Sequence, residues 1–182
     1  MLSSEVMRAA PVEEFREALS RFASGVTIVT ALDASERPRG FTASAFCSVS
    51  LEPPLVLVCL AATADCHSIF TDGVRYAIHI LRADQEALAL RFGQKRHDKF
   101  AGLDFNSVED GLPCLARSLV RLSCRLHARH DGGDHSILVG RVDSVSIGGG
   151  MPAVYYNRHF WSMAGPTGGE LDLERYNLWL IA

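Results

Sequence analysis

The sequence predicts a mainly β protein, an antiparallel barrel that closes on itself and carries a few inserted helices. About six or seven short segments rich in β-branched and apolar residues are separated by Gly, Pro and Asp turns. The helical segments do not alternate regularly with these strands, which argues against a doubly wound parallel sheet. A closed barrel leaves no exposed strand edge and fits this order of elements best.

The first half of the chain is predicted to hold one helix followed by strands. Residues 11–23 should be helical because apolar residues recur at spacings of three and four from Val12 to Phe22. Strands are expected over 26–32, from Gly40 to the break at Glu52-Pro53-Pro54, and over 55–61, with a turn at 33–39. The last of these is an unbroken apolar run, as in a strand buried on both faces.

The second half adds two helices and the longest strands. We expect a short helix over 65–72, a strand over 76–81, a helix over 84–92 with Asp84 as N-cap, an irregular segment over 94–112, and strands over 120–129, 136–147 and 152–161. Residues 120–129 alternate between apolar and polar side chains, so Arg121, Arg125 and Arg129 are expected on a solvated face. The turn Asp131-Gly-Gly-Asp134 should join this strand to the next.

Composition narrows the class of protein. The chain has 182 residues, 48% of them hydrophobic, with 18 basic and 21 acidic side chains and a net charge of −3. We therefore expect one domain over 1–182, with a flexible N-terminus at 1–11 and a tail at 164–182 that could pack on a partner subunit. The absence of a basic bias argues against nucleic acid as a partner. No apolar run is long enough to span a membrane, and the N-terminus lacks a signal-peptide pattern.

The cysteines indicate a reducing compartment and no metal centre. Their number, five, is odd, and none forms a Cys-x-x-Cys pair, so we expect reduced thiols in a cytoplasmic protein. Cys66 and His67 are adjacent, which suits no common zinc motif. We therefore expect no metal site.

The strand that begins at Gly40 has the pattern of a ligand-bearing strand. Thr42, Ser44, Ser48 and Ser50 fall on one side, whereas Ala43, Ala45, Cys47 and Val49 fall on the other. Small side chains let a flat ligand approach the backbone, and hydroxyl and N–H groups can then bond to its heteroatoms. A core strand would carry larger apolar residues instead.

Five motifs follow one another along about residues 12 to 162. They are Phe22-x-x-Gly-Val-Thr-Ile-Val-Thr30; Phe41-Thr-Ala-Ser-Ala-Phe with Ser48-Val-Ser-Leu-Glu-Pro-Pro-Leu-Val-Leu-Val-Cys59; Arg91-Phe-Gly with Asp98-Lys-Phe-Ala-Gly102; Gly133-Asp-His with Gly140-Arg-Val-Asp143; and Tyr155-Tyr-x-Arg-x-Phe160. Together they resemble the flavin reductase family that serves two-component monooxygenases.

The resemblance implies a fold, a reaction and partners. The fold would be an FMN-binding split barrel that works as a homodimer, with the flavin near the subunit interface. The reaction would be hydride transfer from NADH or NADPH to FMN or FAD. Reduced flavin would then pass to a separate oxygenase component. Hydride transfer is chemistry of the cofactors, so the protein must bind and orient them.

The resemblance also implies a set of site residues. The flavin site would comprise Pro38, Gly40, Phe41, Thr42, Ala43, Ser44, Ala45, Cys59, Leu60, Ala61, Asp65, Cys66, Arg91 and Phe92. The nicotinamide side would comprise His135, the predicted catalytic residue, with Tyr155, Tyr156 and Arg158. For the flavin phosphate, which needs a cation, Arg91 is the first candidate and Lys99 the second.

Two positions depart from the family pattern. Cys66 stands where Ser is frequent, and a thiol is the weaker hydrogen-bond donor. Asp65 stands where relatives are often neutral or basic. A carboxylate beside a phosphate is unfavourable, so its side chain is expected to point away.

Other functions remain open on the sequence alone. The chain could be a flavin carrier or sensor without reductase activity, or an oxidase that retains its flavin, like the pyridoxamine-phosphate oxidase relatives of this barrel. The preferences for FMN or FAD, and for NADH or NADPH, are also open, as is the identity of the oxygenase.

Overall fold

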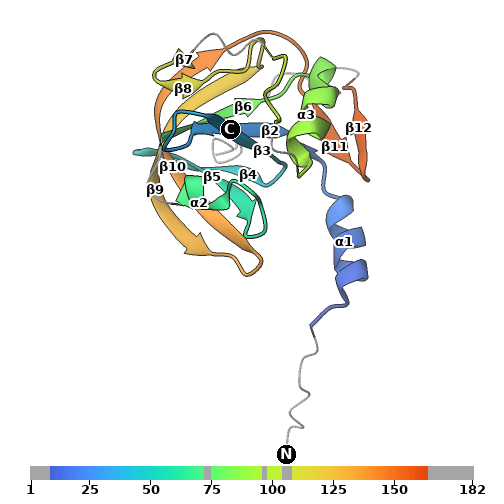
Figure 1. Ribbon diagram of the computed structural model, residues 1–182. Coiled ribbons are helices and arrows are strands. Elements are labelled where there is room, and N and C mark those ends of the chain that lie inside the picture. The colour runs from blue at the N-terminus through green and yellow to red at the C-terminus, as the bar shows by residue number, and fades with distance from the viewer. Residues whose placement is uncertain (1–8, 72–74, 96–97, 104–107, 164–182) are drawn as a thin grey trace, which may run out of the picture.

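The structure is a computed structural model that describes residues 9–71, 75–95, 98–103 and 108–163 (Figure 1). Its centre is a seven-stranded sheet in the order β3-β2-β6-β9-β10-β5-β4, and each neighbouring pair is antiparallel. In chain order these strands are β2 (Thr27–Leu32), β3 (Pro38–Ala43), β4 (Phe46–Leu51), β5 (Pro54–Ala61), β6 (Arg75–Ile80), β9 (Val120–Asp131) and β10 (His135–Ile147). The predicted mainly β, antiparallel class is confirmed.

The remaining elements surround this sheet. The helices are α1 (Val12–Ser20), α2 (His67–Thr71) and α3 (Glu86–Gly93), the last preceded by the 3₁₀ turn η1 (Ala83–Gln85). A small sheet combines β1 (Ser24–Gly25), β11 (Val154–Tyr156) and β12 (His159–Trp161), and β7 (Val108–Glu109) pairs with β8 (Leu112–Pro113). The predicted tail at 164–182 lies outside the described residues. Among the described helices, none has both the length and the apolar character to cross a membrane.

The two ends of the sheet meet at a seam formed by Ser44 and Ala45. The edge strands β3 and β4 are consecutive in the chain, and these two residues alone separate them. The Cys59 N–H donates to Ala45 O at 3.1 Å, which holds this link against β5. The prediction of one strand from Gly40 onward was therefore wrong. The chain breaks at the seam because β3 pairs with β2, whereas β4 pairs with β5.

Helix α3 packs on β3 through a close contact at Gly40. A Cβ atom at Gly40 would lie 2.8 Å from Val29 O and 2.9 Å from Phe92 Cε1, so no side chain fits. The buried Phe92 ring in turn meets Phe100 edge to face, with centroids 4.9 Å apart. Predicted N-cap Asp84 lies instead within η1, and its carboxylate pairs with Arg82 and Arg117.

Two further strand predictions need correction. On β9, Arg121 and Ser123 are buried, so the arginine row is not solvated along its whole length. Arg121 Nη2 lies 3.8 Å from an Asp110 carboxylate oxygen. On β5, burial alternates between buried and half-buried residues, so this strand is fully buried on one face only.

The closing strand predicted over 152–161 is a hairpin. Strands β11 and β12 are joined at Asn157 and Arg158, whose φ angles are 49° and 63°. This hairpin also anchors α1, since the Asn157 N–H donates to Ser20 O at 2.8 Å and Arg158 pairs with Glu17 at 3.3 Å. Figure 1 shows α1 projecting away from the barrel.

Candidate functional site

A cavity of about 270 Å³ opens at the seam of the barrel. We call it the seam cavity. Its lining is Phe41, Thr42, Ala43, Ser44, Ala45, Cys59, Leu60, Ala61, Thr63, Ala64, Asp65, Phe92, Gly93, Gln94, Lys95, Lys99 and His135. The structure thus gathers twelve of the sequence-predicted site residues around one cavity, from strands, a helix end and a hairpin that are distant in the chain.

Small side chains form the wall of the seam cavity at the break between β3 and β4. Ala43, Ser44 and Ala45 line it from one side, and Leu60 and Ala61 at the end of β5 line it too. At this break the carbonyls of Ser44 and Ala45 accept from the N–H groups of Phe46 and Cys59, each at 3.1 Å. A flat heteroaromatic ring can lie against this wall of small side chains, where the N–H groups of Ser44 and Ala45 can donate to it.

The Thr42 hydroxyl, which was predicted to bind the flavin, makes a hydrogen bond within the protein. Its Oγ1 donates to Ala89 O on α3 at 2.7 Å. The hydroxyl therefore ties α3 to β3 and is already engaged, although Thr42 still lines the cavity. Ser44 also lines two neighbouring cavities of about 770 and 400 Å³, so this residue is shared by three cavities.

Lys99 is the better buried of the two lysines that line the seam cavity, since Lys95 is exposed. Lys99 Nζ donates to Gly40 O at 3.2 Å and to Phe92 O at 2.9 Å, and its side chain is half-buried. Burial lowers the pKa of Lys99, although the Asp65 carboxylate raises it in part. An ammonium has three N–H donors. Two are used by these carbonyls, which leaves one for an anion.

Arg91, the first candidate for the phosphate, is turned elsewhere. Its Nη2 donates to Ala101 O, and it is not among the described residues that line the seam cavity. This bond ties the end of α3 to the following loop, which carries Lys99. The structure therefore brings the second candidate, Lys99, to the site, whereas Arg91 lies on α3 outside the lining of the seam cavity.

A second cavity, of about 410 Å³, adjoins the first. We call it the arginine cavity. Its lining is Asp33, Ala34, Ser35, Arg37, Pro38, Arg39, Gly40, Asp65, Cys66, Ile69, Lys99 and Phe100. Three predicted flavin residues, Pro38, Gly40 and Cys66, line this cavity rather than the seam cavity. Asp65 and Lys99 line both and mark the boundary between them.

The thiols near the site are protonated. Burial raises the pKa of both Cys59, in the seam cavity, and Cys66, in the arginine cavity. Cys66 Sγ lies 3.9 Å from Gly40 O, a contact that a weak donor such as a thiol can make. Neither sulfur is therefore an activated nucleophile.

His135 begins β10 and faces Ala61 across the strand pair. Its Nδ1 lies 2.6 Å from the Asp134 carboxylate, and this hydrogen bond lowers the pKa of Asp134. A carboxylate at neutral pH can only accept, so Nδ1 carries the proton and Nε2 is left for a ligand. The pair thus fixes the ring orientation at the edge of the seam cavity.

The three residues predicted for the nicotinamide side are spread over the β11–β12 hairpin. Tyr155 packs edge to face on Phe160 and lines the cavities of about 770 and 400 Å³ next to Ser44. Arg158 lines the larger of these and pairs with Glu17. Tyr156 packs on Trp161, and its carbonyl accepts from Trp161 Nε1 at 2.9 Å. The structure brings Tyr155 to the seam, whereas Tyr156 faces Trp161.

Several lining residues were not predicted. Thr63, Ala64 and Gly93 to Lys95 line the seam cavity, and Arg37 and Arg39 line its neighbour. The segment 93–95 directly follows the Arg91-Phe92 motif, so extending that motif would have found it.

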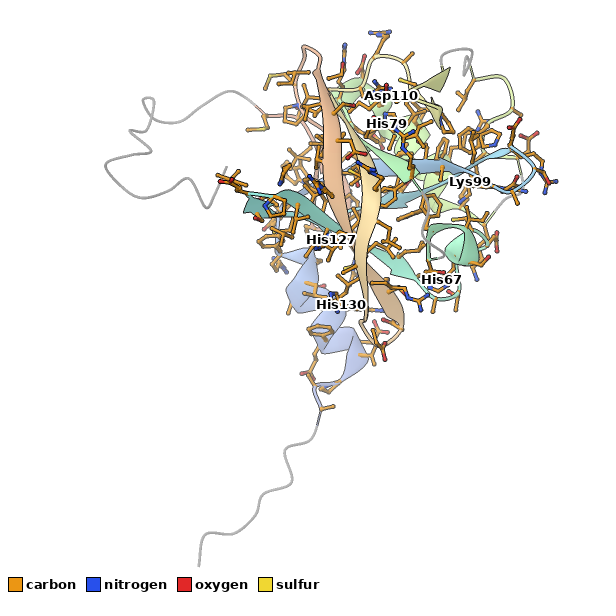
Figure 2. All side chains as sticks on the ribbon, turned by 90° about the vertical axis from the view of Figure 1, so that its left-hand side faces the viewer. His67, His79, Lys99, Asp110, His127 and His130 are labelled. Atoms are coloured by element: carbon orange, nitrogen blue, oxygen red, sulfur yellow. The ribbon has the colours of Figure 1, made fainter. Side chains whose placement is uncertain are left out.

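Figure 2 shows Lys99 well apart from His127 and His130, which lie along β9.

Most of this chain is similar to known proteins. The family model described as "Flavin reductase like domain" matches residues 19–164. The "actinorhodin polyketide dimerase" of Streptomyces coelicolor is 44% identical over 161 residues, covering 88% of this chain and 91% of that protein. The "FMN reductase (NADH) SmoA" of Agrobacterium fabrum is 42% identical over 141 residues, covering 78% and 80%.

A further relative and a solved structure agree with this assignment. The reductase component of 4-hydroxyphenylacetate 3-monooxygenase from Thermus thermophilus is 40% identical over 156 residues, covering 85% of this chain and 99% of that one. The NADH:FAD oxidoreductase SgcE6 of Streptomyces globisporus, solved with NAD and FAD fragments, superposes with a TM-score of 0.80 at 31% identity, covering 89% and 100%. The chain therefore belongs to the flavin reductase family and has its split-barrel fold.

Proposed function

We propose that this protein is an NAD(P)H-dependent flavin reductase that supplies reduced flavin to a separate oxygenase. The observation that carries the proposal is the seam cavity, where a wall of small residues, the Lys99 ammonium and the His135 imidazole converge. Two of the relatives, an FMN reductase and the reductase component of a monooxygenase, support it.

The residues present fit a flavin. The small wall at Ala43 to Ala45 suits the isoalloxazine ring, because its backbone N–H groups can reach the ring heteroatoms where negative charge builds on reduction. Half-buried Lys99 suits the phosphate, because it already has a fixed position and one unused donor. Bound flavin supplies the electron acceptor, which takes a hydride from NAD(P)H and a proton from water.

His135 is proposed to orient the nicotinamide. Its Nε2 is available at the edge of the seam cavity, because Nδ1 is held by Asp134. Holding two reactants in contact lowers the barrier by removing their freedom of motion, and this is the chief task left to the protein. His135→Ala should therefore raise the KM for NAD(P)H about tenfold or more, while the Kd for flavin stays near that of the parent protein.

A homodimer is proposed from the exposed face of α1. All nine residues of α1 are described, and none of them is buried. Even the apolar side chains Phe15 and Leu19 are more than half exposed. A helix this short is marginal alone in water and needs a surface to cover its apolar side. Ile147 on β10, which is 80% exposed, and Leu51 on β4 add further uncovered apolar area.

Two measurements test these proposals. In the first, NADH oxidation at 340 nm should require added FMN or FAD, and the protein should lose its flavin on dialysis. A yellow protein that keeps flavin and consumes NADH without added flavin would indicate a flavin-retaining oxidase instead.

In the second measurement, sedimentation of the parent protein should give twice the mass of one chain. The double variant Phe15→Glu, Leu19→Glu should give the mass of a single chain. A monomeric parent protein would refute the dimer.

A further inference from the structure

The arginine cavity is the larger of the two adjoining hollows, at about 410 Å³ against 270 Å³. It begins where the seam cavity ends, at Asp65 and Lys99. If the flavin ring lies at the seam and its phosphate at Lys99, FMN ends at this boundary. FMN would leave the arginine cavity unfilled, whereas FAD continues beyond that phosphate with an adenylate.

Two arginines are held at fixed positions in the wall of this cavity. Asp33 Oδ2 accepts from Arg37 Nε and from Arg39 Nε, each at 3.1 Å, and Asp33 Oδ1 accepts from the backbone of Ser35 and Arg37. These bonds, chiefly the one from the Arg37 backbone, hold the pKa of Asp33 at about 2. The carboxylate therefore stays charged and keeps both guanidinium groups in place over the neutral pH range.

The arginines retain donors for an anion. A guanidinium has five N–H groups, and Asp33 engages only Nε and Nη2 of Arg39. Arg39 is also the better shielded of the pair, with its side chain 26% exposed against 66% for Arg37. A planar, fixed and partly desolvated guanidinium is the group best suited to bind phosphate.

Apolar side chains also line the cavity. Ile69 on α2 and Phe100 after Lys99 are among them, and Phe100 is held by its edge-to-face contact with Phe92. Aromatic and aliphatic side chains together suit a purine base. The cavity thus offers both cations, at Arg37, Arg39 and Lys99, and apolar surface.

We propose that the arginine cavity binds the adenylate of FAD, so that this reductase prefers FAD to FMN and Arg39 determines the preference. The inference rests on the proposed function, because it assumes a flavin in the seam cavity. The adenylate of NAD(P)H has the same chemistry, but FAD fits better because the cavity continues from the phosphate end of the flavin site, at Asp65 and Lys99.

The test compares flavins in matched variants. Dissociation constants for FAD and FMN are measured by quenching of flavin fluorescence, together with the KM for NADH. The parent protein should bind FAD about tenfold or more tightly than FMN. Arg39→Gln should remove most of this preference with less than about a twofold change for FMN. Ala34→Trp, which adds bulk at an exposed residue of the lining, should do the same without removing a charge.

The control is Arg125→Gln. Arg125 is also an arginine held by a carboxylate, Asp143 at 2.9 Å, but it lies outside both cavities on β9. The Arg125→Gln variant should keep the preference for FAD over FMN. Equal affinity for FAD and FMN in the parent protein, or equal losses for both in Arg39→Gln, would overturn the inference, although FMN reduction would continue. A raised KM for NADH with an unchanged flavin preference would also overturn it and assign the cavity to the nicotinamide nucleotide. If neither flavin binds, the proposed function itself fails.

Discussion

Lys99 donates from its ammonium to the carbonyl of Gly40 at 3.2 Å, across the boundary between two cavities. This bond ties the loop after α3 to β3. Gly40 has no side chain, and this absence lets Phe92 of α3 pack on it. Gly40 therefore contacts both α3, through the Phe92 ring, and the cation of Lys99, through its own carbonyl.

Lys99→Met should weaken FMN binding much more than riboflavin binding, by about tenfold or more, because only FMN has a phosphate. The measurement is fluorescence titration with both flavins. Equal losses of affinity for FMN and riboflavin would show that Lys99 acts on the ring site or on the fold.

The pH dependence of FMN binding gives a second test. Burial lowers the pKa of Lys99 below the ordinary value of 10.5, so FMN affinity should fall with rising pH before 10.5 is reached. Riboflavin affinity should not follow.

Asp65→Asn should tighten the binding of FMN and FAD by about threefold to tenfold and leave riboflavin unchanged. The Asp65 carboxylate lies close enough to Lys99 to affect its pKa, and a like charge opposes a phosphate at the same place. Rapid release suits a flavin that must leave after reduction, so the variant should also slow product release. An unchanged or weaker FMN affinity would show that the carboxylate faces away from the phosphate.

Thr42→Val should destabilise the protein by about 1 kcal/mol, because it removes the hydrogen bond from Thr42 Oγ1 to Ala89 O that ties β3 to α3. Urea unfolding measures the change. Thr42→Ser keeps the hydroxyl and serves as the control. If Thr42→Val instead leaves stability intact and lowers flavin affinity, the hydroxyl binds the ligand, as its place in the sequence first indicated.

The buried His79 should make the protein less stable in acid. Its Nε2 lies 3.1 Å from Thr30 Oγ1 and its Nδ1 3.1 Å from Ser118 Oγ, and burial lowers its pKa to about 3. Above pH 6.5 the His79 ring is neutral in both the folded and the unfolded chain, so it does not change the free energy of unfolding. Below pH 6.5 the unfolded chain binds a proton at His79, whereas the folded chain does not. The free energy of unfolding then falls by up to about 1.4 kcal/mol per pH unit.

Urea unfolding between pH 7 and pH 4 measures this slope. His79→Gln should lower stability at pH 7 but flatten the slope, because glutamine does not titrate. His127→Gln, at an exposed position on β9, is the matched control and should keep the slope of the parent protein. The same slope in the parent protein and in His79→Gln would contradict this account.

The strands were predictable because period-two patterns and turn residues are local signals. The break at the seam was not, because residues from Gly40 to Ser50 alternate without interruption and only pairing with β2 and β5 divides them. Arg121 looked solvated because its neighbour Asp110 lies in a segment with no regular pattern.

The site was predictable to the level of motifs. Arg91 and Lys99 are both cations of one motif, and the fold decides that Lys99 reaches the cavity while Arg91 bonds to Ala101 O. The motifs indicated Pro38, Gly40 and Cys66 of the arginine cavity, but not its charged residues. Asp33, Arg37 and Arg39 resemble an ordinary charged turn in the sequence, and only the fold brings them beside Ile69 and Phe100.

The most direct test of the central claim is anaerobic stopped-flow measurement of flavin bleaching at 450 nm, with NADH and catalytic amounts of the protein. We expect the bleaching rate to rise in proportion to protein concentration, and His135→Ala to require about tenfold more NADH for the same rate. A bleaching rate equal to that of a protein-free mixture, with both FMN and FAD, would contradict the account.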